Sequence, residues 1–221
     1  MRQRYDYDNI QKLYTEYVAD KVDDHNQIEL LKKKIEGKEV FVMVPGNSLN
    51  THRQEIDTYI LENHPIVISV NFVADYPEAI SFFGNAKRYS RLKEKRNGRK
   101  VIVSSNVKSD TEQDIVVNYH SIINRGYKYF ENSTIMLLSL LKRVNPKKVT
   151  MAGFDGFEEG AEINYSDSSF QNERHITEFK ELNEELMKMF GEIVETMSPG
   201  CTFNMITPSK FKTVIDSNCN T

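Results

Sequence analysis

Glu39-Val40-Phe41-Val42-Met43-Val44-Pro45-Gly46-Asn47-Ser48 is the stretch that decides the fold. Its apolar part is too short for a buried helix and ends at a Pro-Gly turn, which is typical of a buried parallel strand. Similar short runs recur along the chain, with helix-prone segments between them. The further strands predicted in this way cover 66–71, 79–83, 100–104, 115–117, 148–153 and 203–206. The alternation predicts an α/β fold with a three-layer, Rossmann-like, doubly wound and mostly parallel sheet.

The segments between these strands carry helical patterns. Helices are predicted over 51–62, 86–97 and 133–144, and a long helix carries apolar residues on one face from Ile176 to Ile193. Residues 133–144 are apolar nearly all round, which indicates a helix inside the core. We expect five to seven strands, with the runs 40–44, 66–70 and 149–152 as adjacent central strands.

The ends of the chain differ in character from this domain. Residues 1–37 read as an N-terminal helical segment or linker, with a break at 23–26, an apolar stripe of Ile28, Leu31 and Ile35, and a stop at Gly37. This segment could pack on the domain or connect it to something upstream. The Rossmann-like domain is predicted over 38–215, and residues 216–221 are predicted to form a frayed tail.

Composition excludes several classes of protein. The chain has 221 residues, a net charge of −3 and no apolar run that approaches the roughly 20 residues of a membrane span. Its beginning lacks the apolar region of a signal peptide, and Cys201 and Cys219 lack metal-site spacing. We therefore expect a cytoplasmic protein with no nucleic-acid partner, no membrane span, no metal and no cofactor.

Polar residues follow the predicted strands at the edge where α/β sheets bind ligands. Asn47, Asn71 and Asn85 follow three successive strands, and the side chain of asparagine offers both donors and an acceptor. Gly46 would allow a ligand close to the backbone, and Ser48 stands in the same turn. The alternative is that these residues only form turns. Further candidates for ligand binding are Ser133, at the start of the buried helix, and Asp155, after the strand 148–153.

Three other residues could carry chemistry. His175 lies at the far end of a polar stretch over 155–172, where it could act as a general base, or could be an exposed residue at a helix start. Tyr127 and Tyr129 could bind a phosphate without a metal, or could pack as aromatic side chains. The basic run from Lys87 to Arg96 is interpreted as a solvated helix face.

The order of these motifs resembles that of the bacterial sialyltransferases that use CMP-sialic acid. The resemblance covers most of residues 38–212. It rests on the turn over 45–49, on Asn71, on Phe82-Phe83-Gly84-Asn85, on residues 132–157 and on residues 203–209. Ser133-Thr134 stands where that family has a Ser/Thr-Gly pair, and His175 falls at the place of its lid histidine. The resemblance implies a nucleotide or nucleotide-sugar site and metal-independent, inverting sugar transfer with His175 as the base.

A second resemblance concerns the context of the domain. Tyr7-Asp8-Asn9-Ile10, continued through Tyr14, Tyr17 and Asp24, is similar to the C-terminal part of larger bacterial proteins. Their front end is an aldolase barrel of the HMG-CoA-lyase and 4-hydroxy-2-oxovalerate aldolase kind, and they occur in surface-polysaccharide settings. This resemblance implies an aldolase domain upstream as a partner. The chain would then be either a sialyltransferase-like enzyme or a non-catalytic accessory domain that binds a small ligand or docks the barrel.

Overall fold

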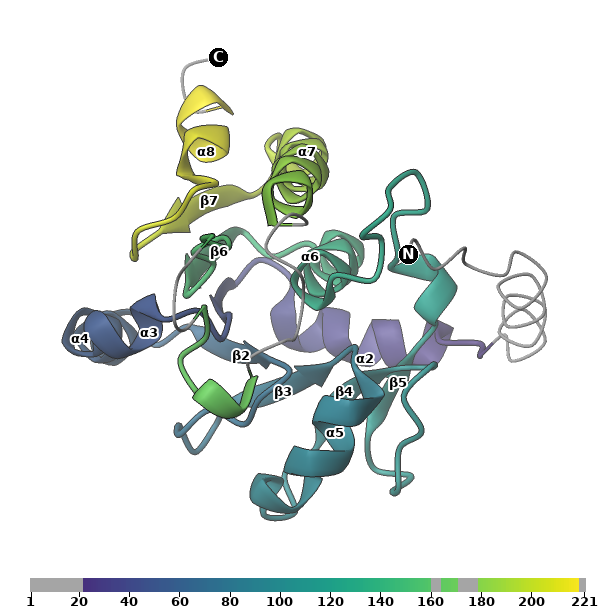
Figure 1. Cartoon of the computed structure of the whole chain (residues 1–221). Helices are drawn as coiled ribbons and strands as arrows, with labels where there is room; N and C mark the ends of the chain where they lie inside the picture. The colour runs from purple at the N-terminus through teal and green to yellow at the C-terminus, as the bar shows by residue number, and fades with distance from the viewer. Residues whose placement is uncertain (1–21, 160–163, 171–178, 219–221) are drawn as a thin grey trace, which may run out of the picture.

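A seven-stranded parallel sheet forms the centre of the protein in a computed structural model, which describes residues 22–159, 164–170 and 179–218 (Figure 1). The strand order is β5-β4-β3-β2-β1-β6-β7, and every pair of neighbouring strands is parallel. The strands are β1 (Glu39–Met43), β2 (Ile66–Val70), β3 (Ile80–Phe83), β4 (Val101–Ser104), β5 (Ile115–Val117), β6 (Lys148–Ala152) and β7 (Thr202–Met205). The predicted Rossmann-like α/β fold is confirmed.

The apolar runs 40–44, 66–70 and 149–152 form β1, β2 and β6, which are adjacent at the centre of the sheet as predicted. Strand β1 pairs with β2 on one side, where Phe41 lies opposite Val67, and with β6 on the other, where Phe41 lies opposite Thr150. From β1 the chain first builds the sheet outward to β5 and then returns to add β6 and β7 on the opposite side. The strand order therefore reverses between β1 and β6, the place where open α/β sheets bind ligands.

Helices cover both faces of the sheet, which gives three layers (Figure 1). Residues of α2, α6, α7 and α8 share one core cluster with Val40 and Val42 of β1. The alternate residues Phe41 and Met43 face α3 and α4 on the other side, and α5 packs beside them on β3 and β4. These helices are α2 (His25–Ile35), α3 (Ser48–Thr51), α4 (Arg53–Asn63), α5 (Ala86–Leu92), α6 (Ser133–Val144), α7 (Phe179–Met197) and α8 (Lys212–Asn218).

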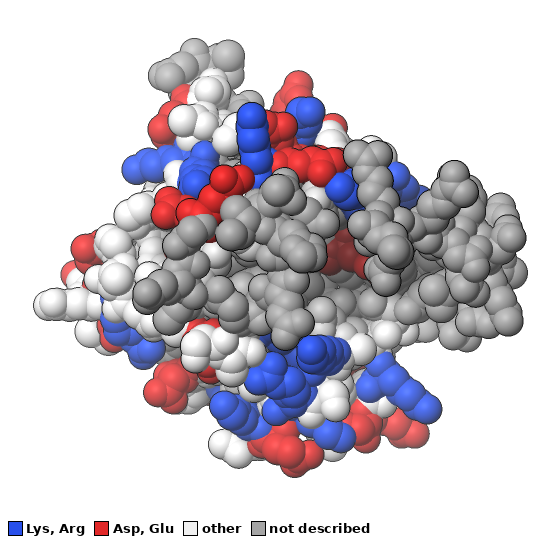
Figure 2. Space-filling view, viewed as in Figure 1, with Lys and Arg blue, Asp and Glu red and all other residues white. Residues whose placement is uncertain are grey.

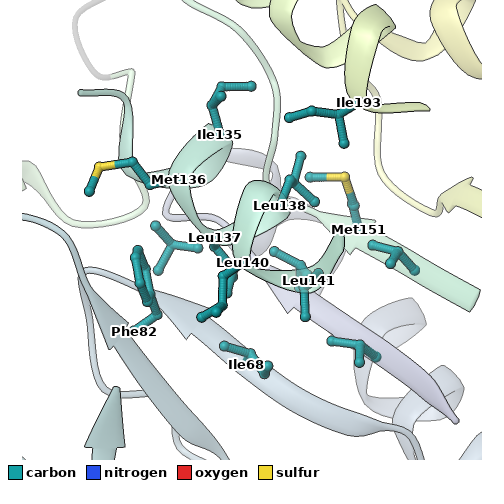
Figure 3. Packing of buried hydrophobic residues seen from close by; sticks show 14 of the residues in the cluster. Ile68, Phe82, Ile135, Met136, Leu137, Leu138, Leu140, Leu141, Met151 and Ile193 are labelled. Atoms are coloured by element: carbon teal, nitrogen blue, oxygen red, sulfur yellow. The ribbon is translucent and has the colours of Figure 1, made fainter. Parts of the chain in front are cut away.

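Helix α6 lies at the centre of the larger core, as its apolar sequence predicts. Leu137, Leu140 and Leu141 point toward the strands that carry Ile68 and Phe82 (Figure 3). On another side of α6, Leu138 lies toward Ile193 of α7, and its neighbours α2 and α7 both contact it. Because α6 is enclosed by sheet and helices, it is apolar around nearly its whole circumference.

The structure gives the packing of the N-terminal stripe, which the sequence left open, and it changes the predicted start of the C-terminal tail. Helix α2 buries Ile28, Leu31 and Ile35 in the same core as α6, so this part of the segment 1–37 is a component of the domain. At the other end, α8 continues through Asn218 into the predicted tail, and its Ile215 is buried. Both helices are short amphipathic elements whose place is decided by the neighbouring helix. Residues 1–21 of the predicted N-terminal segment lie outside the described residues.

Two interior predictions also changed in detail. The helix predicted over 51–62 corresponds to α4, and the short α3 precedes it with a break at His52. The helix predicted over 86–97 is α5, which continues as the 3-10 helix η1 (Lys93–Arg96). No helix among residues 22–159, 164–170 and 179–218 is long and apolar enough to cross a membrane.

The ends of β1 and β6 approach each other through two glycines. The backbone N–H of Gly46 donates to the carbonyl oxygen of Gly153 at 3.0 Å, and a Cβ atom on Gly46 would overlap that oxygen. Gly153 has a φ of +76°, and a Cβ atom there would overlap the carbonyl oxygen of Val44. Because both overlaps involve backbone atoms, neither position can accept a side chain without moving a central strand.

Gly153→Ala is expected to lower the free energy of unfolding by about 4 kcal/mol or more, because left-handed strain and backbone overlap act together. Gly98→Ala is the matched control, since Gly98 has a φ of +74° and no atom near its Cβ position. The control should cost only about 1–2 kcal/mol. Equal losses of stability for the two variants in urea denaturation would contradict the close approach of β1 and β6.

Candidate functional site

A cavity of about 160 Å³ lies beyond the carboxyl ends of β1, β2, β3 and β6, where the strand order reverses. Five residues predicted to bind ligand line it, although they come from distant parts of the sequence. These five are Gly46, Asn71, Asn85, Ser133 and Asp155. The other residues that line it are Val44, Pro45, Val70, Arg88, Glu131, Asn132, Thr134, Gly153, Phe154, Gly156, Phe157, Asn164 and Tyr165.

The turn after β1 is occupied by the protein's own carboxylate. Asp155 Oδ2 accepts the backbone N–H of Ser48 at 2.8 Å, and Asp155 Oδ1 accepts a hydrogen bond from the Ser48 hydroxyl. Ser48 is buried and Asn47 is exposed, and neither lines the cavity. The first backbone donor of α3 is therefore already used, so this turn does not offer the anion site that a helix start often provides.

Burial raises the pKa of the Asp155 carboxyl above its usual range, and the hydrogen bonds from Ser48 act in the opposite direction. This direction means that the folded state holds the proton of Asp155 more tightly than the unfolded state does.

Asn71 and Asn85 both use their side-chain oxygen within the protein. Asn71 Oδ1 accepts the backbone N–H of Gly84 at 3.1 Å, and the residue itself has a φ of +58°. Asn85 Oδ1 accepts the backbone N–H of Arg88 at 3.0 Å and so caps α5. The side-chain amide nitrogen, Nδ2, of neither asparagine has a hydrogen-bond partner among the described residues. The side-chain oxygens of these asparagines stabilise turns, whereas their side-chain N–H groups remain available to donate to a ligand.

Ser133 lies at the start of α6, directly against Gly84. A Cβ atom on Gly84 would come within 2.8 Å of Ser133 Oγ, so the turn after β3 and the start of α6 are in close contact. Asn132 caps the helix through its side-chain oxygen, which accepts the backbone N–H groups of Thr134 and Ile135. The capped start of α6 therefore forms part of the cavity wall, to which Ser133 contributes a hydroxyl group.

Arg88 is a charged lining residue that the sequence analysis counted only as part of the solvated basic run. Its Nη2 donates to the carbonyl oxygen of Phe170 at 2.5 Å, whereas its Nη1 is buried without a hydrogen-bond partner among the described residues. Burial lowers the pKa of this guanidinium, as expected for a cation held away from water. The signal in the sequence was its place three residues after Asn85, which puts it in the first turn of α5.

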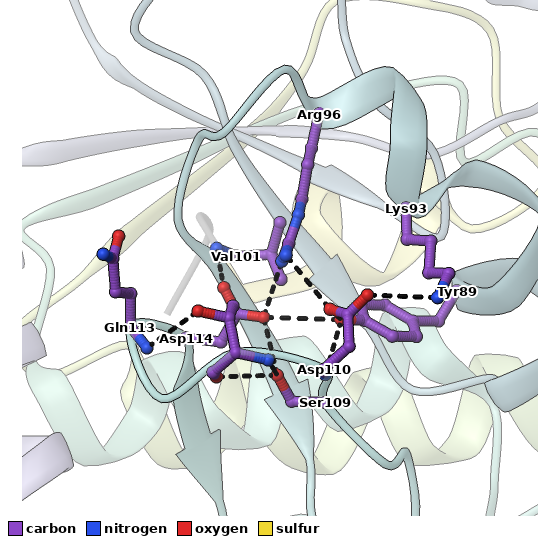
Figure 4. A network of polar contacts seen from close by, with 9 residues as sticks. Tyr89, Lys93, Arg96, Val101, Ser109, Asp110, Gln113 and Asp114 are labelled. Carbon is purple, nitrogen blue, oxygen red and sulfur yellow. Dashed lines mark hydrogen bonds and ion pairs between the residues drawn. The ribbon is translucent and has the colours of Figure 1, made fainter.

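A polar network holds α5 and η1 against the edge of the sheet. Arg96 forms ion pairs with Asp114 at 2.6 Å and with Asp110 at 3.0 Å, and Tyr89 donates to Asp110 (Figure 4). Asp114 is buried and also accepts the backbone N–H of Val101 in β4. This network fixes the helix that carries Arg88.

Part of the basic run behaves as predicted for a solvated face. Lys87, Arg91 and Lys95 are exposed, and Lys and Arg side chains gather over the region of α5 and η1 (Figure 2). Two residues of the run are exceptions. Arg96 forms the ion pairs described above, with only 14% of its side chain exposed. Arg88 turns under the exposed face toward Tyr165 and Phe170. Its Cζ atom lies 5.4 Å from the ring centroid of Tyr165 and 4.1 Å from that of Phe170.

Part of the polar stretch after β6 folds back over the strand ends. Tyr165 forms an isolated antiparallel bridge with Gly46, and the backbone N–H of Ser166 donates to the carbonyl oxygen of Pro45 at 2.9 Å. Asn50 of α3 donates to the carbonyl oxygen of Ser166 at 2.7 Å. This pairing brings Asn164 and Tyr165 to the wall of the cavity.

Two further predicted residues, Tyr127 and Tyr129, are not brought to the cavity. Tyr127 donates to Glu192 of α7, and this hydrogen bond together with burial raises the pKa of Tyr127 to about 12. The backbone N–H of Tyr129 donates to Glu185 at 2.9 Å, and its side chain packs against the main core. Both tyrosines therefore attach the segment before α6 to α7. His175 lies outside the described residues.

A larger hollow, of about 300 Å³, lies at the opposite edge of the sheet against α2. It is lined mainly by the amino-terminal ends of β3 and β4, and its Arg99 donates to the backbone carbonyl of Tyr76 at 2.7 Å. The cavity at the carboxyl ends is the better candidate, because ligand sites of parallel sheets form at that edge.

Within the described part of the chain, no three His, Cys, Asp or Glu side chains gather as a metal site would require. No protein-family model matches the chain, and no curated protein matches its sequence. The resemblances to sialyltransferases and to aldolase-linked domains therefore stay predictions.

Asp155→Asn is expected to change how stability depends on pH. Because the pKa of Asp155 is raised in the folded state, the wild-type protein should lose stability relative to Asp155→Asn as the pH rises above about 4. The difference should level off once the pH exceeds the folded pKa. Asparagine can still accept the Ser48 N–H and can donate to the Ser48 hydroxyl. Urea unfolding at a series of pH values measures this difference.

Asp167→Asn is the control of opposite sign. Hydrogen bonds from Ser169 hold the pKa of Asp167 below its usual range, so its contribution should be lost as the pH falls. A wild-type protein that gains stability relative to Asp155→Asn with rising pH would show that Asp155 is stabilised as the carboxylate.

Proposed function

We propose that this chain binds a nucleotide or a nucleotide sugar in the cavity at the carboxyl ends of β1, β2, β3 and β6. The observation that carries the proposal is the convergence of Gly46, Asn71, Asn85, Ser133 and Asp155 on one cavity at the reversal of strand order. A few convergent polar groups at such a place are typical of a small-molecule site in this class of fold.

The polar groups divide the cavity into two sides. Asn71, Asn85 and Arg88 come from the β2, β3 and α5 side and offer N–H donors. Asp155, which follows β6, adds a carboxyl group on the other side. Glu131, directly before the cap of α6, also lines the cavity, and its Oε1 accepts a hydrogen bond from the Tyr119 hydroxyl. A ligand that fits both sides carries acceptor oxygens at one end and hydroxyl groups at the other, as nucleotides and nucleotide sugars do.

The sialyltransferase resemblance supports the choice of ligand class. It assigns Asn71 and Asn85 to nucleotide or sugar contacts, and both line the cavity. On this proposal the protein belongs to surface carbohydrate biosynthesis, and transfer would proceed with inversion at the sugar carbon. Asn47, which the resemblance also assigns, is exposed outside the cavity and is left out of the proposed site.

Asn71→Asp and Asn85→Asp should each weaken binding of cytidine or uridine nucleotides about 10-fold or more. Aspartate keeps the oxygen that accepts the Gly84 N–H at position 71 or caps α5 at position 85. It replaces the amide NH2 donor by a carboxylate oxygen, which carries negative charge. Calorimetry with CMP, CDP, UMP and UDP measures the affinities. Asn97→Asp is the control for the same change of side chain outside the cavity, and like Asn71 it has a positive φ, of +48°.

Absence of binding by all four nucleotides at millimolar concentration would count against the proposal. The protein would then be better described as an accessory domain that docks a partner.

His175→Ala separates binding from catalysis. The resemblance makes His175 the base that takes the proton of the acceptor hydroxyl, and loss of a positioned base typically slows a reaction about 10²–10⁴-fold. We expect release of CMP from CMP-sialic acid to fall by this factor while the affinity for CMP is unchanged. Equal rates in the two proteins would remove His175 from the mechanism, and no turnover in either would leave a binding domain without chemistry.

A further inference from the structure

We infer that Arg88 is the anion-binding residue of the cavity and that it holds the phosphate of the bound nucleotide. The inference rests on the proposed function, which it deepens by giving the ligand an orientation. The phosphate would lie on the β3 and α5 side, and the sugar would lie toward Asp155 and the ends of β1 and β6.

The guanidinium of Arg88 has incomplete partners within the protein. Nη2 donates to Phe170, but Nη1 is buried and has no hydrogen-bond partner among the described residues. No described carboxylate forms an ion pair with Arg88, whereas Arg96, on the following helical turns, pairs with two. A buried donor without an acceptor costs free energy, and an oxyanion that reaches it recovers this cost.

The surroundings hold Arg88 in one position before a ligand arrives. The rings of Tyr165 and Phe170 contact its guanidinium, and its backbone N–H is fixed by Asn85. The network around Arg96 and Asp114 anchors the same helix to β4 (Figure 4). Because these contacts orient the planar guanidinium in advance, little side-chain entropy remains to be lost on binding.

The other candidate places for the phosphate are already satisfied or unfavourable. The backbone N–H of Ser48 donates to Asp155, and those of Thr134 and Ile135 donate to Asn132. A phosphate beside Asp155 would also face a carboxyl group. Among the described residues, Arg88 and the side-chain amide N–H groups of Asn71 and Asn85 are left as donors that form no hydrogen bond with a carboxylate.

Arg88→Gln should weaken CMP binding about 10- to 100-fold, the range expected for loss of a charge-assisted hydrogen bond. The affinity for cytidine, which lacks the phosphate, should be unchanged by the substitution and lower than that for CMP in the wild-type protein. The CMP affinity of Arg88→Lys should lie between those of the wild-type protein and Arg88→Gln, since lysine keeps the charge and loses the planar fork. Arg91→Gln is the matched control, because Arg91 lies on the same helix and binds the Ser169 carbonyl outside the cavity.

Calorimetry and thermal unfolding are measured on all four proteins with CMP, cytidine, inorganic phosphate and sialic acid. A purely structural Arg88 would lower the melting temperature of Arg88→Gln without ligand but leave the stabilisation by CMP equal to that of wild type. That result would overturn the inference and leave the proposed function standing.

The remaining outcomes separate the two proposals. Binding of inorganic phosphate or sialic acid that depends on Arg88, without binding of CMP or cytidine, would support the anion site and overturn the nucleotide ligand. A preference for sialic acid over phosphate would assign the anion to a sugar carboxylate and overturn the proposed orientation. Equal affinity for cytidine and CMP would overturn the role of Arg88 alone, and no binding by any probe would overturn both proposals.

Discussion

The close approach of β1 and β6 is the constraint on which the rest of the structure depends. The two strands pair along their length, and Gly46 and Gly153 then bring their ends together at a distance that no side chain would allow. The strand order reverses at this place, so the connections from β1 and β6 diverge to opposite sides of the sheet. The space between the diverging segments becomes the cavity.

The same contact explains why the first turn is not itself the anion site. The chain leaves β6 at Gly153 and carries Asp155 directly to the backbone of Ser48. A carboxylate from the protein thus takes the place at the start of α3 that a ligand anion takes in many α/β folds. The positive charge of the site lies instead on the next part of the sheet edge, at Arg88.

The amino-acid sequence was sufficient to predict the architecture. Runs such as Val40–Val44 and Val149–Ala152 are too short and too apolar for anything but buried parallel strands, and their order of alternation with helices leaves few topologies. The buried helix over 133–144 was predicted with the bounds that α6 has. The stripe of Ile28, Leu31 and Ile35 was also predicted, but its packing was left open, because an isolated amphipathic stripe does not show which neighbour will cover it. The predicted tail began inside α8.

The candidate site was predictable in part. The carboxyl ends of parallel strands meet at one edge, so Gly46, Asn71, Asn85 and Asp155 were expected together, and the structure brings them to one cavity. Tyr127 and Tyr129 were selected only for being polar aromatics near a helix start. Their contacts with Glu192 and Glu185 of α7 depend on helix packing, which the local sequence does not show.

By itself the sequence determined the fold class, the central strands and the edge of the sheet where polar residues collect, because these follow from local hydrophobic periodicity. Only the tertiary structure decided which polar groups are already used within the protein. Ser48 and Asp155 satisfy each other, and the asparagine oxygens are bound to backbone N–H groups, whereas Arg88 keeps a buried donor. The physical reason is that hydrogen-bond satisfaction depends on groups far apart in the chain, and burial sets how much each unsatisfied group costs.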